Sequence, residues 1–203
     1  MDAATFVAQL GHRRHSRRVA NPYRSETLRN NLLAYLEAIM LQPGRRILLV
    51  GEALGYRGGR LTGIPFSSSR LLRQAPHPFL RRLSPELVIE EDVAEATASI
   101  VWSCLAQRRN IPMAWNAFPF HPHQENVPET NRAPDAAELE EGAAILRELA
   151  ALYQPQLVVG VGAKGFRAAS SAFPQEAVMA VRHPSYGGKQ DFVAGLKRAY
   201  RRR

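Results

Sequence analysis

An acid, an amide and an imidazole stand at the ends of three short apolar runs that lie far apart in the chain. Glu52 follows the run R-I-L-L-V-G, Asn116 lies near the end of I-P-M-A-W-N-A, and His183 ends A-V-M-A-V-R-H. These residue types supply acid–base chemistry, hydrogen-bonded recognition and stabilisation of developing charge. They can act together only where the fold brings the three run ends to one place.

A glycine-rich segment follows the first run and is suited to holding phosphates. Residues 51–66 read G-E-A-L-G-Y-R-G-G-R-L-T-G-I-P-F, and so many glycines allow the backbone to approach a ligand closely. Arg57 and Arg60 within it, and Ser67 at the predicted start of a helix, are candidate phosphate contacts because cations and helix N-termini bind anions. The alternative interpretation is a flexible loop that leads into a capped helix.

The elements that would position these residues follow from the apolar patterns. Short runs rich in branched and large apolar residues predict buried strands at residues 46–52, 111–117, 157–162 and 177–183. Amphipathic patterns between them predict helices at residues 25–41, 91–109, 135–153, 163–172 and 189–201. This alternation favours an α/β sandwich with a four-stranded parallel sheet and helices on both faces. Ligands bind beyond the carboxyl ends of such strands, so Glu52, Asn116 and His183 are expected to converge.

The length of the chain, 203 residues, fits one α/β domain with a substantial core. The sequence contains no linker, repeat or low-complexity tract, so residues 1–203 are interpreted as a single domain. Residues 1–24, which are rich in arginine, are a candidate basic N-terminal extension. The Pro-rich segment 118–134 is expected to be an ordered functional loop rather than a domain boundary.

The charge balance indicates a polyanionic partner. Lysine and arginine number 27 against 18 acids, which gives a net charge of +9, and such a surplus favours nucleic acid. The basic residues gather in small clusters at Arg13, Arg14, Arg17 and Arg18, Arg45 and Arg46, Arg81 and Arg82, Arg108 and Arg109, and Arg198 with Arg201 to Arg203. The alternative is a composition that simply uses arginine on solvated surfaces.

The sequence argues against membranes, disulfides and cysteine-bound metals. It contains no stretch of about 18 apolar residues, and its first residues lack the apolar core of a secretory signal. Cys104 is the sole cysteine, so neither an internal disulfide nor a cysteine-only metal site can form. His121 and His123 form an H-x-H pair without further ligands at suitable spacing, so no metal or cofactor is expected. We expect a monomer without an obligate protein partner, located in the cytoplasm at the nucleoid.

Four motifs in a fixed order resemble those of the uracil-DNA glycosylases. The segment 51–66 is similar to the first signature of the branch that reads G-E-x-P-G, continues to G-x-P-F and usually carries an iron–sulfur cluster. W-N-A-F-P-F-H-P around Asn116, N-R-A-P-D-A-A-E-L-E-E at residues 131–141 and R-H-P-S at residues 182–185 resemble later segments of that family. Order and spacing agree from about residue 46 to residue 200.

The resemblance implies a monofunctional DNA glycosylase of base excision repair. Such an enzyme flips uracil out of DNA and hydrolyses its glycosidic bond, which leaves an abasic site. Phe66 would stack on the extruded base, Asn116 would bind its Watson–Crick edge, and His183 would stabilise the charge that grows on its O2. The backbone at Gly51, Ala53 and Gly55 would close the pocket. Further contacts to DNA phosphates are implied for Ser185, Arg182 and Lys189. Lys164, in the glycine-rich turn after residue 160, is a further candidate phosphate contact.

The reaction explains why an acid is needed as well. Cleavage makes a cationic sugar and an anionic base, and donors aimed at the forming anion stabilise the transition state more than the ground state. A carboxylate near the sugar favours the cation and can orient or activate water. Glu52 is the one acid in the first motif and is assigned this role. The alternative for Glu52 is a structural acid bonded to a loop amide.

Several positions depart from the family pattern. Ala53 stands where the best-known branch has an aspartate, and Gly55 where that branch has a tyrosine that bars thymine's methyl group, so a substrate range beyond uracil is expected. Tyr186 follows H-P-S in place of the usual apolar wedge and is the candidate to fill the hole left by the flipped base. The cluster cysteines are missing, so no iron–sulfur cluster is expected.

Two other functions stay open on the sequence. Ala53 keeps open a non-catalytic reader of uracil or damaged bases that has the pocket without effective water activation. Gly160, Gly162 and Gly165 form G-x-G-x-x-G between a strand and a helix, which is the form of the dinucleotide-binding fingerprint. No acid stands at the end of the following strand, so close packing of helix on strand is the favoured interpretation of these glycines.

Overall fold

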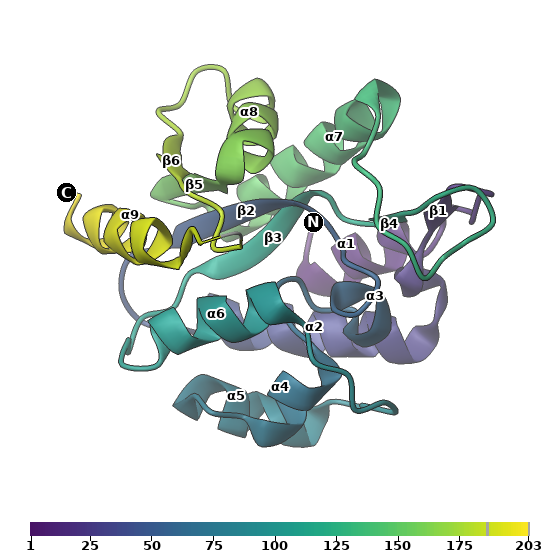
Figure 1. The fold of residues 1–203 in the computed structure, drawn as a ribbon, viewed down its shortest axis with the longest axis horizontal. Coiled ribbons are helices and arrows are strands. Elements are labelled where there is room, and N and C mark those ends of the chain that lie inside the picture. The colour runs from purple at the N-terminus through teal and green to yellow at the C-terminus, as the bar shows by residue number, and fades with distance from the viewer. Residues whose placement is uncertain (186, 203) are drawn as a thin grey trace.

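A four-stranded parallel sheet forms the centre of the computed structural model, which describes residues 1–185 and 187–202 (Figure 1). The strand order is β3-β2-β5-β6. The strands are β2 (Ile47–Ala53), β3 (Met113–Phe118), β5 (Leu157–Val161) and β6 (Met179–Val181). All are short apolar runs, because helices cover a parallel sheet on both faces. The predicted sheet is therefore confirmed.

Helices cover the two faces of this sheet. Helices α7 (Ala136–Tyr153) and α8 (Gly162–Ala172) lie on one face, and α2 (Glu26–Met40) and α6 (Ala96–Leu105) on the other (Figure 1). Helix α9 (Lys189–Arg201) packs against β6. The shorter helices are α1 (Ala3–Leu10), α3 (Gly59–Thr62), α4 (Ser69–Gln74) and α5 (Pro78–Leu83), with 3-10 turns at Pro22–Arg24 and Ser84–Glu86. The sandwich with helices on both faces is as predicted.

Two glycines set how closely the helices approach the sheet. A Cβ at Gly142 in α7 would lie 2.0 Å from the carbonyl oxygen of Ala117 in β3, and one at Gly165 in α8 would lie 2.6 Å from that of Val50 in β2. Neither strand backbone can move aside without breaking its ladder. The two helices therefore rest directly on the strands whose carboxyl ends carry the candidate residues.

The helix boundaries show where the pattern was informative. Helices α2, α7, α8 and α9 begin and end close to the predicted residues, and α7 opens with a capping box of Asp135 and Glu138. The helix predicted over residues 91–109 is shorter: Glu95, in an extended conformation, caps it, and the helix spans Ala96–Leu105. No helix in the described part of the chain is long and apolar enough to cross a membrane.

The N-terminal segment folds into the domain instead of extending from it. Phe6, Val7 and Leu10 of α1 are buried in the same core as the sheet residues, and the ring of Phe6 lies 5.7 Å from that of Trp115 in β3. Strand β1 (Val19–Ala20) pairs with β4 (His121–Pro122) in the Pro-rich loop. The prediction that residues 1–24 form an extension rested on their arginines. The buried apolar residues of α1 follow the i, i+3, i+4, i+7 spacing of a helix that packs on a core.

Replacing Phe6 tests this packing. We expect Phe6→Ala to lower the free energy of unfolding by about 3–5 kcal/mol, because the change leaves a cavity against Trp115. Urea unfolding followed by fluorescence measures it. Leu41, which is 84% exposed, is the matched control, and Leu41→Ala should stay within about 0.5 kcal/mol of wild type. An unchanged midpoint for Phe6→Ala would mean that the segment does not contribute to the core.

Candidate functional site

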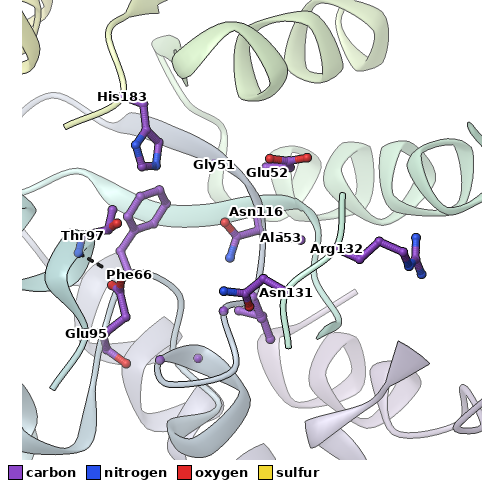
Figure 2. Close-up of a pocket in the computed structure, with 15 residues that line it drawn as sticks. Gly51, Glu52, Ala53, Phe66, Glu95, Thr97, Asn116, Asn131, Arg132 and His183 are labelled. Carbon is purple, nitrogen blue, oxygen red and sulfur yellow. Dashed lines mark hydrogen bonds between the residues drawn. The ribbon is translucent and has the colours of Figure 1, made fainter. Parts of the chain in front are cut away.

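A cavity of about 240 Å³ opens at the carboxyl ends of β2 and β3 (Figure 2). It is lined by Glu52, Asn116 and His183, so the three polar residues that end separate apolar runs do converge. Gly51, Ala53, Gly55 and Phe66 line it too, as expected. The volume is below the range of about 300–1,000 Å³ usual for ligand pockets, and it suits a single planar ring better than a whole nucleotide.

Gly51 lets an aromatic ring and an amide approach the same point of the sheet. It pairs in register with Asn116 on β3. A Cβ at residue 51 would lie 2.5 Å from Asn116 Oδ1 and 2.5 Å from Phe66 Cζ, so only glycine leaves room for both side chains. The aromatic plane and the amide therefore form one corner of the cavity.

Phe66 is held in an unusual backbone conformation at this corner. Its φ is 51°, in the left-handed region that a bulky L-residue occupies at a cost of about 1–3 kcal/mol. The indole Nε1–H of Trp102 in α6 donates to the carbonyl oxygen of Phe66 at 3.0 Å and fixes the turn. Strain of this kind persists where the surrounding structure imposes it, which is common at binding sites.

The amide of Asn116 is almost buried and has no hydrogen-bond partner among the described residues. The residue is 4% exposed and its side chain faces the cavity beside Phe66 (Figure 2). Its polar atoms reach the cavity and are not among the fully enclosed, unpartnered atoms of the described residues. An unpaired amide aimed into a small cavity is suited to a ligand that presents its own donor and acceptor.

His183 presents a neutral imidazole to the same cavity. The backbone N–H of Ser185 donates to His183 Nδ1 at 3.2 Å, so the neutral ring carries its proton on Nε2. Burial lowers the pKa of His183 below its usual value; Glu95 opposes this shift, the charge of Arg182 reinforces it, and Glu52 opposes it. At neutral pH the residue is therefore an N–H donor without a full positive charge.

Glu52 lies at the edge of the cavity on the side of α8. Successive side chains of a strand point to opposite faces, and Gly51 faces Phe66 and Asn116, so Glu52 points the other way. Its Oε1 lies 3.0 Å from Nζ of Lys164 in the first turn of α8, and its side chain is 34% exposed. The carboxylate is thus tethered to a lysine and remains accessible to solvent and to a bound molecule.

The residues predicted to contact phosphates are more scattered. Arg57, Arg182 and Lys189 are exposed and do not line the cavity. Arg60 donates to the carbonyl oxygen of Tyr56 and lies 3.9 Å from Glu129. Tyr186, the residue predicted to fill the hole left by the flipped base, lies outside the described residues.

Three other predicted phosphate contacts have partners within the protein. The hydroxyl of Ser67 is buried and bonds to Thr62 and to the carbonyl oxygen of Ile64, so it faces the interior. Ser185 Oγ lies 3.2 Å from Thr97 Oγ1. Lys164 pairs with Glu52 as described. Of the seven predicted phosphate contacts, Ser67 is the one that lines the cavity. Residue type alone does not predict the direction of a side chain.

Four polar or charged cavity residues had no predicted role. Glu95, Thr97, Asn131 and Arg132 all line the cavity. Both carboxylate oxygens of Glu95 accept backbone N–H bonds at the start of α6, from Thr97 at 2.9 Å and from Ala98 at 2.6 Å. The usable signal for Asn131 and Arg132 was the N-R-A-P motif. Glu95 had none, because the helix predicted over residues 91–109 placed it inside the helix and not at its start.

The other motifs are accounted for by packing. A Cβ at Gly160 would lie 2.3 Å from Cα of Phe166, so the G-x-G-x-x-G turn brings α8 close to the sheet. His121 Nδ1 lies 2.8 Å from the carbonyl oxygen of Leu54 and Nε2 lies 2.8 Å from that of Pro128, which ties the Pro-rich loop to the cavity wall. In the described residues no three histidine, cysteine or acidic side chains gather as a metal site.

Comparisons with known proteins agree with this architecture. A family model described as the uracil DNA glycosylase superfamily matches residues 39–200. No curated protein sequence matches the chain. Among solved structures, the crystal structure of wild-type Pedobacter heparinus SMUG2 is similar with a TM-score of 0.68 and 18% sequence identity, over 99% of this chain and 97% of that chain. At this identity the likeness to SMUG2 shows the fold.

Proposed function

The chain belongs to the uracil DNA glycosylase superfamily, and from that premise we propose that it is a monofunctional glycosylase that hydrolyses the glycosidic bond of uracil in DNA. The observation that supports this most is the buried, unpaired amide of Asn116 beside the ring of Phe66 in a cavity of single-base size. A base pair is too large for this cavity, so the target base must leave the stack before it enters. Membership in the G-E-x-P-G branch remains a prediction.

In the proposed complex Phe66 and Asn116 recognise the base. The ring of Phe66 supplies a plane on which any pyrimidine stacks. The amide of Asn116 offers an acceptor and a donor to the N3–H and a carbonyl oxygen of uracil. Cytosine carries an amino donor and an unprotonated N3 in these places, so one fixed amide orientation does not satisfy both bases. Discrimination then comes from the unpaired groups left by the wrong base.

His183 acts on the departing base. Cleavage breaks the bond between C1′ and N1, and the electron pair leaves with the base, where charge spreads to O2. The Nε2–H of neutral His183 is the donor assigned to that oxygen, and its preorganisation in a partly buried site strengthens the interaction. A neutral donor also spares the site the cost of burying a full imidazolium charge.

Glu52 acts on the other half of the reaction. Its carboxylate favours the cationic sugar and orients the water whose oxygen bonds to C1′; the proton released by that water passes to the carboxylate or to solvent. Its position at the α8 edge, tethered by Lys164, leaves the space between the strand ends to the base and sugar. No cofactor is required by this sequence of steps.

The direct test is cleavage of end-labelled oligonucleotides that contain one uracil, single-stranded and paired with guanine or adenine. Alkali-sensitive cleavage at the uracil is the expected result. Thymine paired with guanine belongs in the same series, because a Cβ at Gly55 would have only Asn131 Oδ1, at 3.9 Å, nearby, so Gly55 gives no steric bar to a methyl group. Absence of cleavage at enzyme excess, with hypoxanthine and xanthine included, would reject the enzyme.

A non-catalytic reader of uracil is the second candidate function. Ala53 provides no second acid after Glu52, and Glu52 is already paired with Lys164, which favours a site that binds without activating water. Such a protein would retain uracil-containing strands in preference to thymine-containing ones without releasing uracil. Binding with no alkali-sensitive product distinguishes it from the glycosylase.

Lys164 is expected to position Glu52 and to contribute little to DNA affinity. We expect Lys164→Gln to lower kcat by up to about a hundredfold, because a displaced carboxylate no longer meets the water in line, and to leave KM and its salt dependence unchanged. Steady-state kinetics at several salt concentrations measure both. Arg167→Gln, an exposed cation on the same helix, is the matched control. A raised KM with a shallower salt slope would instead assign Lys164 to a phosphate.

A further inference from the structure

A groove with a basic lining runs between α6 and α9. On the α9 side it is lined by Lys189 and Lys197, with Val193 between them, and on the α6 side by the residues around Arg108. Residues 189, 193 and 197 stand one helical turn apart, so they form a single stripe that faces α6. Asp191 lies on a different side of α9 and does not line the groove.

A second groove continues the first around the end of α6. It is lined by Arg82, Arg108 and Arg109, and it shares with the first groove the segment 106–108. Neither groove has an aspartate or a glutamate among its described lining residues. We call the two together the basic groove, defined by its cations Arg82, Arg108, Arg109, Lys189 and Lys197.

The central cation of the basic groove is held by aromatic packing and not by an acid. The guanidinium of Arg108 lies 4.5 Å from the centre of the Tyr200 ring, and the hydroxyl of Tyr200 donates to the carbonyl oxygen of Asn110 at 2.8 Å. A cation held over an aromatic face keeps its charge and its outward N–H groups. The guanidinium of Arg108 is therefore held in place, and its charge remains available to an anion.

The basic groove begins beside the cavity. Lys189 is the first residue of α9, and the preceding Gly188 packs so closely on His183 that a Cβ there would lie 2.1 Å from the carbonyl oxygen of His183. From that point the stripe on α9 leads away from His183 toward the C-terminal end of α6, as the course of α6 and α9 in Figure 1 shows. A chain that leaves the cavity on this side meets cations at once.

We propose that the basic groove holds single-stranded DNA that flanks the target nucleotide on one side. The proposal rests on the proposed function for the identity of the strand. A row of cations without acids favours a polyanion, and a groove between two neighbouring helices receives one phosphate backbone where a duplex would rest on its rims. The enzyme is thereby expected to prefer a uracil that has a single-stranded extension of one polarity.

Two variants with equal net charge separate placement from total charge. The groove variant replaces Arg82, Arg109 and Lys197 with glutamine, and the control variant replaces Arg14, Arg147 and Arg167, which are exposed outside the groove. Each lowers the net charge from +9 to +6 by removing three cations. Lys189 and Arg108 are kept, because Lys189 begins α9 directly after the turn that packs on His183, and Arg108 packs on Tyr200.

Binding is measured by fluorescence anisotropy on uracil-free single strands at several salt concentrations. For the groove variant we expect Kd to rise roughly tenfold and the salt slope to become shallower by about 2, at about 0.7 for each lost contact to a single strand. The control variant should bind nearly as wild type. An equal loss in both variants would overturn the proposal, since only net charge would then matter.

A cleavage assay is the second part of the test. The substrates are strands with uracil near one end and an extension of increasing length on the 5′ or the 3′ side. For wild type, extension on one of the two sides should lower KM. The groove variant should lose this effect. Equal effects from both sides, or an equal effect from a duplex extension, would overturn the single-strand proposal. Binding of uracil-free strands needs no catalysis, so failure of the glycosylase assay leaves the anisotropy test intact, and the two proposals can fail separately.

Discussion

Glu52→Gln is expected to lower the rate of uracil release by roughly 10²- to 10⁴-fold, the usual contribution of a positioned acid–base group. The amide keeps the size of the side chain and its carbonyl oxygen can still accept from Lys164, which lies 3.0 Å away in the wild type. It cannot take a proton from water or carry the negative charge that favours a cationic sugar. Binding of uracil-containing strands should change little, because recognition is assigned to Phe66 and Asn116.

Single-turnover cleavage at enzyme excess, together with binding measured separately, isolates the chemical step. The matched control is Glu125→Gln, which removes an exposed carboxylate that lies 3.7 Å from Arg17. It should cleave at the wild-type rate. If Glu52→Gln also retains that rate, the catalytic contribution lies with His183 and the DNA phosphates, and Glu52 is a structural acid held by Lys164.

The sequence predicted the framework of this site well because the framework depends on local patterns. Apolar runs identify the strands, and a parallel sheet brings their carboxyl ends to one edge, so the convergence of Glu52, Asn116 and His183 follows from topology. Phe66 joined them through the resemblance of its motif. The left-handed backbone at Phe66, which aims the ring at Gly51, could not be predicted, because it depends on Trp102 thirty-six residues later.

Side-chain direction is the part that the sequence left open. Ser67 resembled a phosphate contact by type and position, yet its hydroxyl is satisfied inside by Thr62 and Ile64. Lys164 was assigned to DNA from its place in a glycine-rich turn, while its nearest acid, Glu52, is distant in sequence. Glu95 was missed because a helix boundary was misplaced by a few residues. The hydrogen bonds of Ser67 and Glu95 are local, yet they depend on the exact turn and helix start. The contact of Lys164 with Glu52 is long-range and depends on the fold.

His183→Ala is expected to lower the rate roughly 10²- to 10³-fold, the usual effect of removing one donor to a developing anion. Single-turnover cleavage measures this effect as well. The residue acts as a neutral donor, so activity is present above its pKa and is lost as the pH falls through it. Burial lowers that pKa, so this acidic limb of the rate lies below the ordinary histidine value of about 6.5. The reason for the loss is geometric: protonation places a second N–H on Nδ1, opposite the N–H of Ser185 that Nδ1 accepts in the neutral form.

Charges next to His183 allow a test of its role as a neutral donor, because a residue with a purely structural role would not shift the pH dependence of the rate. Glu95 raises the pKa of His183 and Arg182 lowers it, so Glu95→Gln should move the acidic limb to lower pH and Arg182→Gln should move it to higher pH. Rate profiles for the two variants and wild type at constant ionic strength measure the shifts. If the acidic limb of the rate profile stays in place in both variants, the titrating group is not His183. Glu52 is then the first group to examine. Opposite shifts would support the imidazole that faces the base as the titrating group, because Glu95 and Arg182 act on the pKa of His183 in opposite directions.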